Sequence, residues 1–102
     1  MLRSNRVLNF GPGGNALYSG NNLTLANCAT QAAAYGATLF GLEGGFECWV
    51  GIDEARAYSQ GALAQSSCNW ACTGDPSSTC GGAWAVQIYK FNNVQGAWRH
   101  VR

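Results

Sequence analysis

The sequence predicts a small α+β domain with one main helix packed on a small antiparallel sheet. Three observations support this fold class. The chain has 102 residues, which is the size of one domain with a single core. One alanine-rich segment has the composition of a helix, and three later segments have the apolar or alternating pattern of strands. Five cysteines in so short a chain indicate a disulfide-stapled domain.

Composition excludes several classes of protein. Hydrophobic residues make up 47% of the chain, and net charge is minimal, so the chain is not disordered. Six lysines and arginines against five acidic residues give a net charge of +1, which argues against electrostatic binding of nucleic acid. Apolar runs are broken by Gly, Asn, Gln and Ser before they reach the about 20 residues of a membrane span. We therefore expect no nucleic-acid partner and no membrane insertion.

The first half of the chain contains the main helix. Residues 1–16 are expected to be irregular, because Gly11-Pro12-Gly13-Gly14 forces a loop. Thr24 is a good N-cap for a helix over residues 25–35. Gly36 then supplies the left-handed residue that ends this helix.

A β-hairpin is predicted directly after the helix. Residues 37–42 and 46–51 have the pattern of two strands, and Glu43-Gly44-Gly45 is a plausible turn between them. Gly44 and Gly45, like Gly81 and Gly82 further along, are interpreted as turn residues without a ligand role.

Side-chain alternation along the second strand assigns its residues to two faces of the sheet. Phe46, Cys48 and Val50 share one face, which is interpreted as the core. Glu47 and Trp49 share the other, so Trp49 is expected on the outer face beside a carboxylate.

The second half of the chain has fewer regular elements. Residues 52–67 are loop-like, and residues 73–77 have the composition of a tight turn. Residues 84–91 form the third predicted strand. The segment 90–102 is interpreted as a mostly polar C-terminal tail.

The cysteines favour disulfides over a zinc site or reduced structural cysteines. Cys68 and Cys72, with Cys80 beyond, do not form the paired CxxC pattern of zinc sites, and the single histidine, His100, lies in the tail. We therefore expect an oxidising compartment and no metal or cofactor. Because five is odd, at least one thiol is free, pairs with another chain, or has its partner outside this sequence.

An extracellular location, secreted or at the cell wall or surface, fits these cysteines. Residues 1–6 lack the apolar region of a signal peptide, so we expect an excised or artificially started mature domain. Asn22-Leu23-Thr24 is a sequon for N-glycosylation and is consistent with secretion.

Four ordered motifs resemble the WSC domain, a family of carbohydrate-binding modules. They cover most of the chain, from about residue 6 to residue 89, as parts of a single domain. The resemblance implies a PAN/apple-like architecture. The motifs are residues 23–28 (LTLANC), 41–51 (GLEGGFECWVG), 68–75 (CNWACTGD) and 80–82 (CGG) followed by Ile88-Tyr89.

The departures from the family pattern concern cysteines. Members usually carry eight cysteines in four disulfides. Ala32 and Val50 stand at the positions of one paired couple, so we expect these small apolar residues to share a core contact. The family's first cysteine precedes Arg6 by several residues and is not in this sequence, and its usual partner matches Cys68.

The resemblance also implies a disulfide pairing. It predicts Cys28–Cys48, which ties the helix to a strand, and Cys72–Cys80, which closes the tight turn. Cys68 remains as the free thiol. Each disulfide is expected to contribute about 2–4 kcal/mol of stability.

By the same resemblance, the function is non-catalytic binding of cell-wall or extracellular polysaccharide, a β-glucan or related glycan. The domain would be an appendage of a secreted enzyme or part of a surface sensor. Sugars present apolar C–H faces between hydroxyls, so aromatic rings beside polar groups suit them. We favour exposure for Trp49 and Trp70 and core packing for Trp84 and Tyr89. The candidate binding residues are Trp49, Trp70, Trp84, Tyr89, Glu47, Asp53, Asn69 and Gln87.

Three alternatives stay open. A protein–protein or self-association module would use the same exposed aromatic residues, and a purely structural domain would bury them. An enzyme is the third, but Cys68 has no evident base and His100 lies outside the matched region. Glu43 and Glu47 flank a two-glycine turn, and the domain is too small for the deep cleft of a glycosidase. We therefore expect no catalytic residues.

Overall fold

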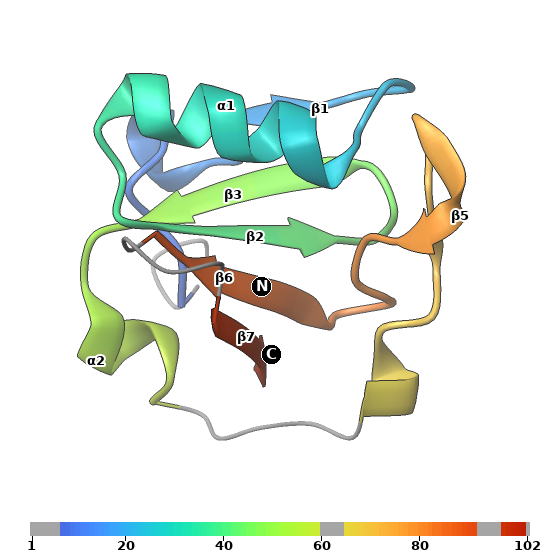
Figure 1. Ribbon diagram of the computed structural model, residues 1–102. Helices are drawn as coiled ribbons and strands as arrows, with labels where there is room; N and C mark the ends of the chain where they lie inside the picture. Colours follow the sequence, from blue (N-terminus) through green and yellow to red (C-terminus); the bar gives the residue numbers. More distant parts are fainter. Residues whose placement is uncertain (1–6, 60–64, 92–96, 102) are drawn as a thin grey trace.

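A computed structural model describes residues 7–59, 65–91 and 97–101, the last five by their backbone alone (Figure 1). The strands form two sheets, and within each sheet neighbouring strands are antiparallel. Two 3-10 turns, η2 (Pro12–Gly14) and η3 (Gln65–Ser67), lie in the connections between these elements. A small second sheet pairs β4 (Ala71–Cys72) with β5 (Asp75–Thr79). The main sheet has the order β1 (Tyr18–Ser19), β3 (Glu47–Gly51), β2 (Leu39–Glu43), β6 (Val86–Lys90) and β7 (Ala97–Val101).

The main helix, α1 (Leu25–Tyr35), begins and ends where its capping residues predict. The Thr24 hydroxyl accepts a hydrogen bond from the Asn27 backbone N–H at 2.9 Å, and Gly36 adopts a left-handed conformation with φ of 89°. The helix lies across β3 and β2 and covers one face of the sheet (Figure 1). The predicted small α+β domain, with one main helix and antiparallel strands, is confirmed.

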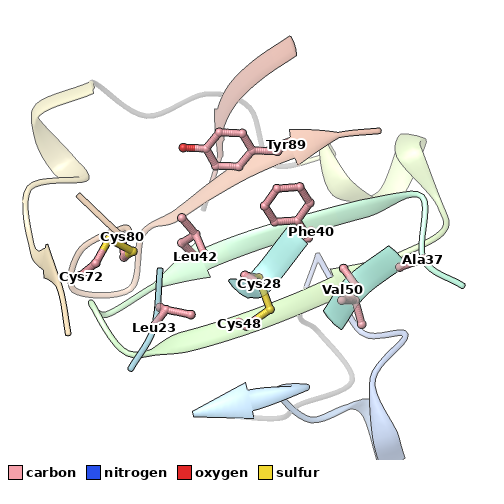
Figure 2. Packing of buried hydrophobic residues seen from close by; sticks show 11 residues of the cluster. Leu23, Cys28, Ala37, Phe40, Leu42, Cys48, Val50, Cys72, Cys80 and Tyr89 are labelled. Carbon is pink, nitrogen blue, oxygen red and sulfur yellow. A yellow bond between two sulfur atoms is a disulfide. The ribbon is translucent and has the colours of Figure 1, made fainter. Parts of the chain in front are cut away.

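The face of the sheet under α1 forms the first hydrophobic core. Cys28 of the helix is bonded to Cys48 of β3 within this core, with a Cα–Cα distance of 5.5 Å (Figure 2). Ala32 and Val50, which replace a family cysteine pair, are both fully buried in the same cluster. The buried members are Leu23, Cys28, Ala32, Ala37, Phe40, Leu42, Cys48, Val50, Cys72, Cys80 and Tyr89.

The opposite face of the sheet is also buried, which corrects the prediction that Trp49 is exposed. Trp49 is 1% exposed and lies opposite Gly41 in the β2–β3 register. A Cβ atom on Gly41 or Gly51 would come within 2.6 or 2.8 Å of the Leu8 side chain, so these glycines leave room for Leu8. The outer face is therefore a second core. Its buried members are Val7, Leu8, Leu39, Trp49, Ala57, Val86 and Ile88.

Phe46 was expected in the core but is exposed. It belongs to the turn before β3, which begins at Glu47, so the alternation of the strand does not apply to it. The next predicted strand is likewise shorter than expected. It forms β6 from Val86 to Lys90, and Trp84 lies before it with a φ of 56°.

Regular structure also forms in segments expected to be loop or tail. The short helix α2 (Glu54–Ala57) is capped by Asp53, whose Oδ1 accepts from the Arg56 N–H at 3.1 Å. In the expected tail, β7 pairs with β6 through the backbone, a type of bond that an apolar pattern does not reveal. The predicted tight turn between Cys72 and Cys80 is confirmed in part, because β5 follows directly after the turn.

Candidate functional site

Three chain segments meet at the end of the sheet where β2 turns into β3. We call this region the hairpin end and define it as residues 44–46, 68–71 and 80–85. The Gly45 N–H donates to the Cys80 carbonyl at 2.8 Å, and the Trp70 N–H donates to the Gly81 carbonyl at 2.9 Å. The Gly44 N–H donates to the Gly82 carbonyl at 3.2 Å. Backbone hydrogen bonds therefore join all three segments.

The glycines of the hairpin end have a steric reason. Gly45 and Gly81 have φ values of 83° and 78°, where residues with a side chain are strained. A Cβ on Gly45 would lie 2.7 Å from the Ala71 carbonyl oxygen, and one on Gly81 would lie 2.6 Å from that of Ala85. Their predicted role as turn residues is confirmed.

Large aromatic side chains project from all three segments. Phe46, Trp70 and Trp84 are 41%, 48% and 59% exposed, and we call them the hairpin-end aromatics. The Phe46 ring lies 3.3 Å from the position of a Cβ on Gly44, and the Trp70 Cβ lies 3.7 Å from that on Gly45. The Phe46 ring and the base of the Trp70 side chain therefore lie beside the glycine turn of the hairpin.

The predictions for the aromatic residues are right in part. Trp70 is exposed and Tyr89 is in the core, as expected. Trp84 is exposed instead of buried, because it lies in the turn before β6 and not on the strand. Phe46 was missed as a candidate. Its place directly after two glycines was the available signal, since such a residue belongs to the turn.

The acidic candidates have structural partners away from any common site. Glu47 is half-buried, and its Oε1 accepts a hydrogen bond from the Trp49 indole N–H at 3.0 Å. Asp53 caps α2 at the far end of β3. The structure does not bring Asp53 to the hairpin end.

Of the two amide candidates, one is open to solvent and one is buried. Asn69 is exposed beside Trp70, and its Oδ1 lies 3.5 Å from the position of a Cβ on Gly82. Gln87, the other candidate, is buried, and its amide bonds to other residues of the domain instead of facing solvent. Its Oε1 accepts from the Gly81 N–H, and its Nε2 donates to the Tyr89 hydroxyl at 3.0 Å. Gln87 therefore holds the turn at Gly81 in place through its side-chain amide.

Comparison with known proteins assigns the family. A family model described as WSC domain matches residues 9–82. The chain belongs to the WSC domain family. A WSC domain-containing protein of Arthroderma benhamiae is 39% identical over 75 residues, which are 74% of this chain and 10% of that protein. Kremen protein 1 of Xenopus laevis is 33% identical over 77 residues, 76% of this chain and 16% of that protein.

A third relative is an enzyme by name. Xylosyltransferase oxt of Drosophila melanogaster is 35% identical over 65 residues, 64% of this chain and 7% of that protein. This WSC domain thus spans less than a fifth of the length of each of these relatives.

Both disulfides predicted for this WSC domain are present. Cys28–Cys48 lies in the first hydrophobic core, under α1. Cys72–Cys80 joins β4 to the residue that precedes Gly81. The second disulfide thereby closes one side of the hairpin end. The Thr73 N–H also donates to the Gly45 carbonyl at 2.9 Å, which fixes this turn against the hairpin.

Cys68 is the free thiol, as predicted, and it is buried. Burial raises the pKa of its thiol from 9.0 to about 11, and the nearby Glu43 carboxylate acts in the same direction. The thiolate is the nucleophilic form of cysteine, so Cys68 is deactivated at neutral pH. Burial likewise raises the pKa of Tyr89 to about 12.

Within the residues that the structure describes, no three His, Cys, Asp or Glu side chains gather in a way that could hold a metal ion. The described part of the chain also has no helix with the length and apolar character to cross a membrane.

Proposed function

We propose that this WSC domain is a non-catalytic module that binds polysaccharide through the hairpin-end aromatics. The observation that carries this proposal is the exposure of Phe46, Trp70 and Trp84 on turns that are hydrogen-bonded to one another. A small domain needs its large apolar side chains for the core, so a group of them outside the core indicates an interaction surface.

Aromatic rings on this surface suit sugars. The apolar C–H face of a pyranose stacks on an indole or phenyl ring, while its hydroxyls need amide or hydroxyl partners at the rim. Asn69 is the exposed amide beside Trp70. None of residues 44–46, 68–71 and 80–85 is charged, which favours a neutral polysaccharide such as a β-glucan or a related cell-wall glycan.

The proposed setting is extracellular. Two disulfides in so small a domain are typical of an oxidising compartment. The relatives are much longer than this chain, which supports a role as an appendage of a secreted enzyme or as part of a surface sensor.

The test is retention on insoluble polysaccharide. Pull-downs on β-glucan, chitin and xylan compare the unmodified protein with Trp70→Ala and Trp84→Ala. Each substitution is expected to weaken binding roughly tenfold, the effect of losing about 1.4 kcal/mol of contact energy. Ile52→Ala is the control, because Ile52 is equally exposed but follows β3 at its far end. Equal loss in all three variants, or no retention of folded protein on any polysaccharide, contradicts the proposal.

The same exposed rings also support a second candidate, a protein–protein or self-association module. Light scattering on the same variants distinguishes the two. Absence of polysaccharide binding, together with a dimer that Trp70→Ala dissociates, favours this alternative. Hydrolysis or oxidation of a glycan by the pure protein, lost in Glu47→Gln, overturns the non-catalytic assignment.

A further inference from the structure

The turn between β1 and α1 contains a modification motif that polysaccharide binding does not use. Asn22-Leu23-Thr24 is the single Asn-X-Ser/Thr sequence in the chain. Asn22 is exposed on this turn, while Leu23 is fully buried beneath it. We propose that Asn22 is an N-glycosylation site that carries an asparagine-linked oligosaccharide. The proposal depends on the extracellular setting given above, but not on polysaccharide binding.

The backbone of Asn22 is held from both sides. Its N–H donates to the Tyr18 hydroxyl at 3.2 Å, and its carbonyl accepts from the Asn27 side-chain amide at 2.9 Å. Among the described residues, no hydrogen bond engages the Asn22 side chain. A glycan on this amide therefore displaces no hydrogen bond made by the described residues, and it extends into solvent from a backbone that is held in place.

The neighbouring residues of the motif are engaged in the folded state, which sets the order of events. The Thr24 hydroxyl caps α1, and the Leu23 N–H donates to the Thr73 hydroxyl at 3.1 Å. The Leu23 carbonyl also accepts from the Gly74 N–H at 2.8 Å. Because Thr24 is part of the recognised sequence, transfer takes place while these contacts are still open, before the chain between Leu23 and Gly74 has closed.

The reaction is a group transfer without oxidation or reduction. The donor is an oligosaccharide joined to a lipid through pyrophosphate, as supplied in the secretory pathway. The Asn22 Nδ2 forms a bond to the anomeric carbon of the first sugar, and the bond from that carbon to the pyrophosphate oxygen breaks. The amide loses one proton, and the lipid pyrophosphate leaves.

The position of the turn places the glycan at a defined end of the molecule. The Gly20 N–H donates to the Phe46 carbonyl at 3.1 Å, and the Thr73 hydroxyl donates to the Gly20 carbonyl at 2.7 Å. The loop between β1 and α1 accordingly lies beside β5 and near the β2–β3 turn (Figure 1). The attachment point of the oligosaccharide would lie next to the hairpin end, on the side of Phe46.

The test is the mass of the chain secreted from yeast behind a cleavable leader. We expect the mass to exceed that of the polypeptide by one glycan. Peptide-N-glycosidase should release this glycan and convert the Asn22 amide into a carboxylate, detected in the mass of its peptide. Asn22→Gln should abolish the modification. Asn21→Gln is the matched control, because it alters the adjacent exposed asparagine and leaves the sequon intact.

Thr24→Ser is a second variant that keeps a capping hydroxyl and the sequon, so it should remain glycosylated. Secreted, folded protein with the bare polypeptide mass overturns the proposal, as does a glycan that persists in Asn22→Gln. Neither measurement involves a polysaccharide ligand. Secreted protein that is unglycosylated but still binds β-glucan overturns the Asn22 site alone, and glycosylated protein that binds none overturns only the binding function.

Discussion

The body of the main sheet and its hairpin end both carry tryptophan, but only the body buries it. Trp49 packs in the core opposite Gly41 and donates its indole N–H to Glu47. Trp70 and Trp84 lie on turns with about half of each side chain in solvent. The two regions are held by different interactions, and this difference explains where rings can be exposed.

In the body, side-chain packing on both faces and the Cys28–Cys48 disulfide hold the strands. At the hairpin end, backbone hydrogen bonds, close contacts at glycines, the Cys72–Cys80 disulfide and the Gln87 amide hold the turns. Because these interactions fix the turns through the backbone, the glycines, the disulfide and Gln87, the aromatic side chains remain about half exposed and can meet a ligand. Mutations should therefore separate stability from binding according to region.

Trp49→Ala should have the largest effect on stability. Removing a fully buried indole leaves a cavity beside Leu8 and deprives Glu47 of its hydrogen-bond donor. We expect the free energy of unfolding in urea to fall by about 3–5 kcal/mol. Trp49→Phe keeps most of the ring and should lose less. A loss of unfolding free energy below about 1 kcal/mol in Trp49→Ala would contradict the presence of a second core on this face of the sheet.

Removal of either disulfide should cost somewhat less. Cys28–Cys48 and Cys72–Cys80 close loops with sequence separations of 20 and 8 residues. The loop-entropy relation gives about 3 kcal/mol for the longer loop and about 2.5 kcal/mol for the shorter one, measured by urea unfolding of double alanine variants. For the same loss of stability, the Cys72/Cys80 double variant should weaken polysaccharide binding more than the Cys28/Cys48 double variant does. Equal binding in both variants at matched stability would show that this disulfide does not organise the hairpin end.

The thiol of Cys68 should react slowly, because burial raises its pKa to about 11. At pH 8 its thiolate fraction is roughly 100-fold below that of a thiol with a pKa of 9.0, so we expect at least about tenfold slower alkylation. In the folded protein the alkylation rate should rise with pH up to about pH 11. In denaturant the rate should level off near pH 9. In denaturant one thiol per chain should react. Three reactive thiols would show that one disulfide is absent, and five would show that both are.

Local signals explain what could be predicted from the sequence. The helix bounds follow from Thr24 and Gly36, which act within a few residues of their own position. The hairpin follows from its two glycines. The disulfide pairing is what the resemblance to the WSC domain family implies, since connectivity does not follow from cysteine count.

The errors arise where distant segments decide burial. The alternation along β3 is real, but whether its outer face is exposed depends on residues 7 and 8, about forty positions away in the chain. Nothing local to Trp49 reports that Leu8 covers the same face. The burial of Gln87 has a nearer cause, because its side-chain amide bonds to the Gly81 N–H six residues earlier and to the Tyr89 hydroxyl.

The smallest effects should come from the hairpin end, and Trp84 offers an internally matched pair of variants. Its φ of 56° lies in the left-handed region, which is strained for residues with a side chain and not for glycine. Trp84→Ala and Trp84→Gly both remove the ring, so any contact of the indole cancels in their comparison. The glycine variant should be more stable by up to about 1 kcal/mol in urea unfolding, through relief of this strain. Both should bind polysaccharide equally weakly, since binding depends on the ring and not on the backbone. If the alanine variant were the more stable one, the turn would not impose a left-handed conformation at residue 84. The backbone would then not be what holds the hairpin end at Trp84.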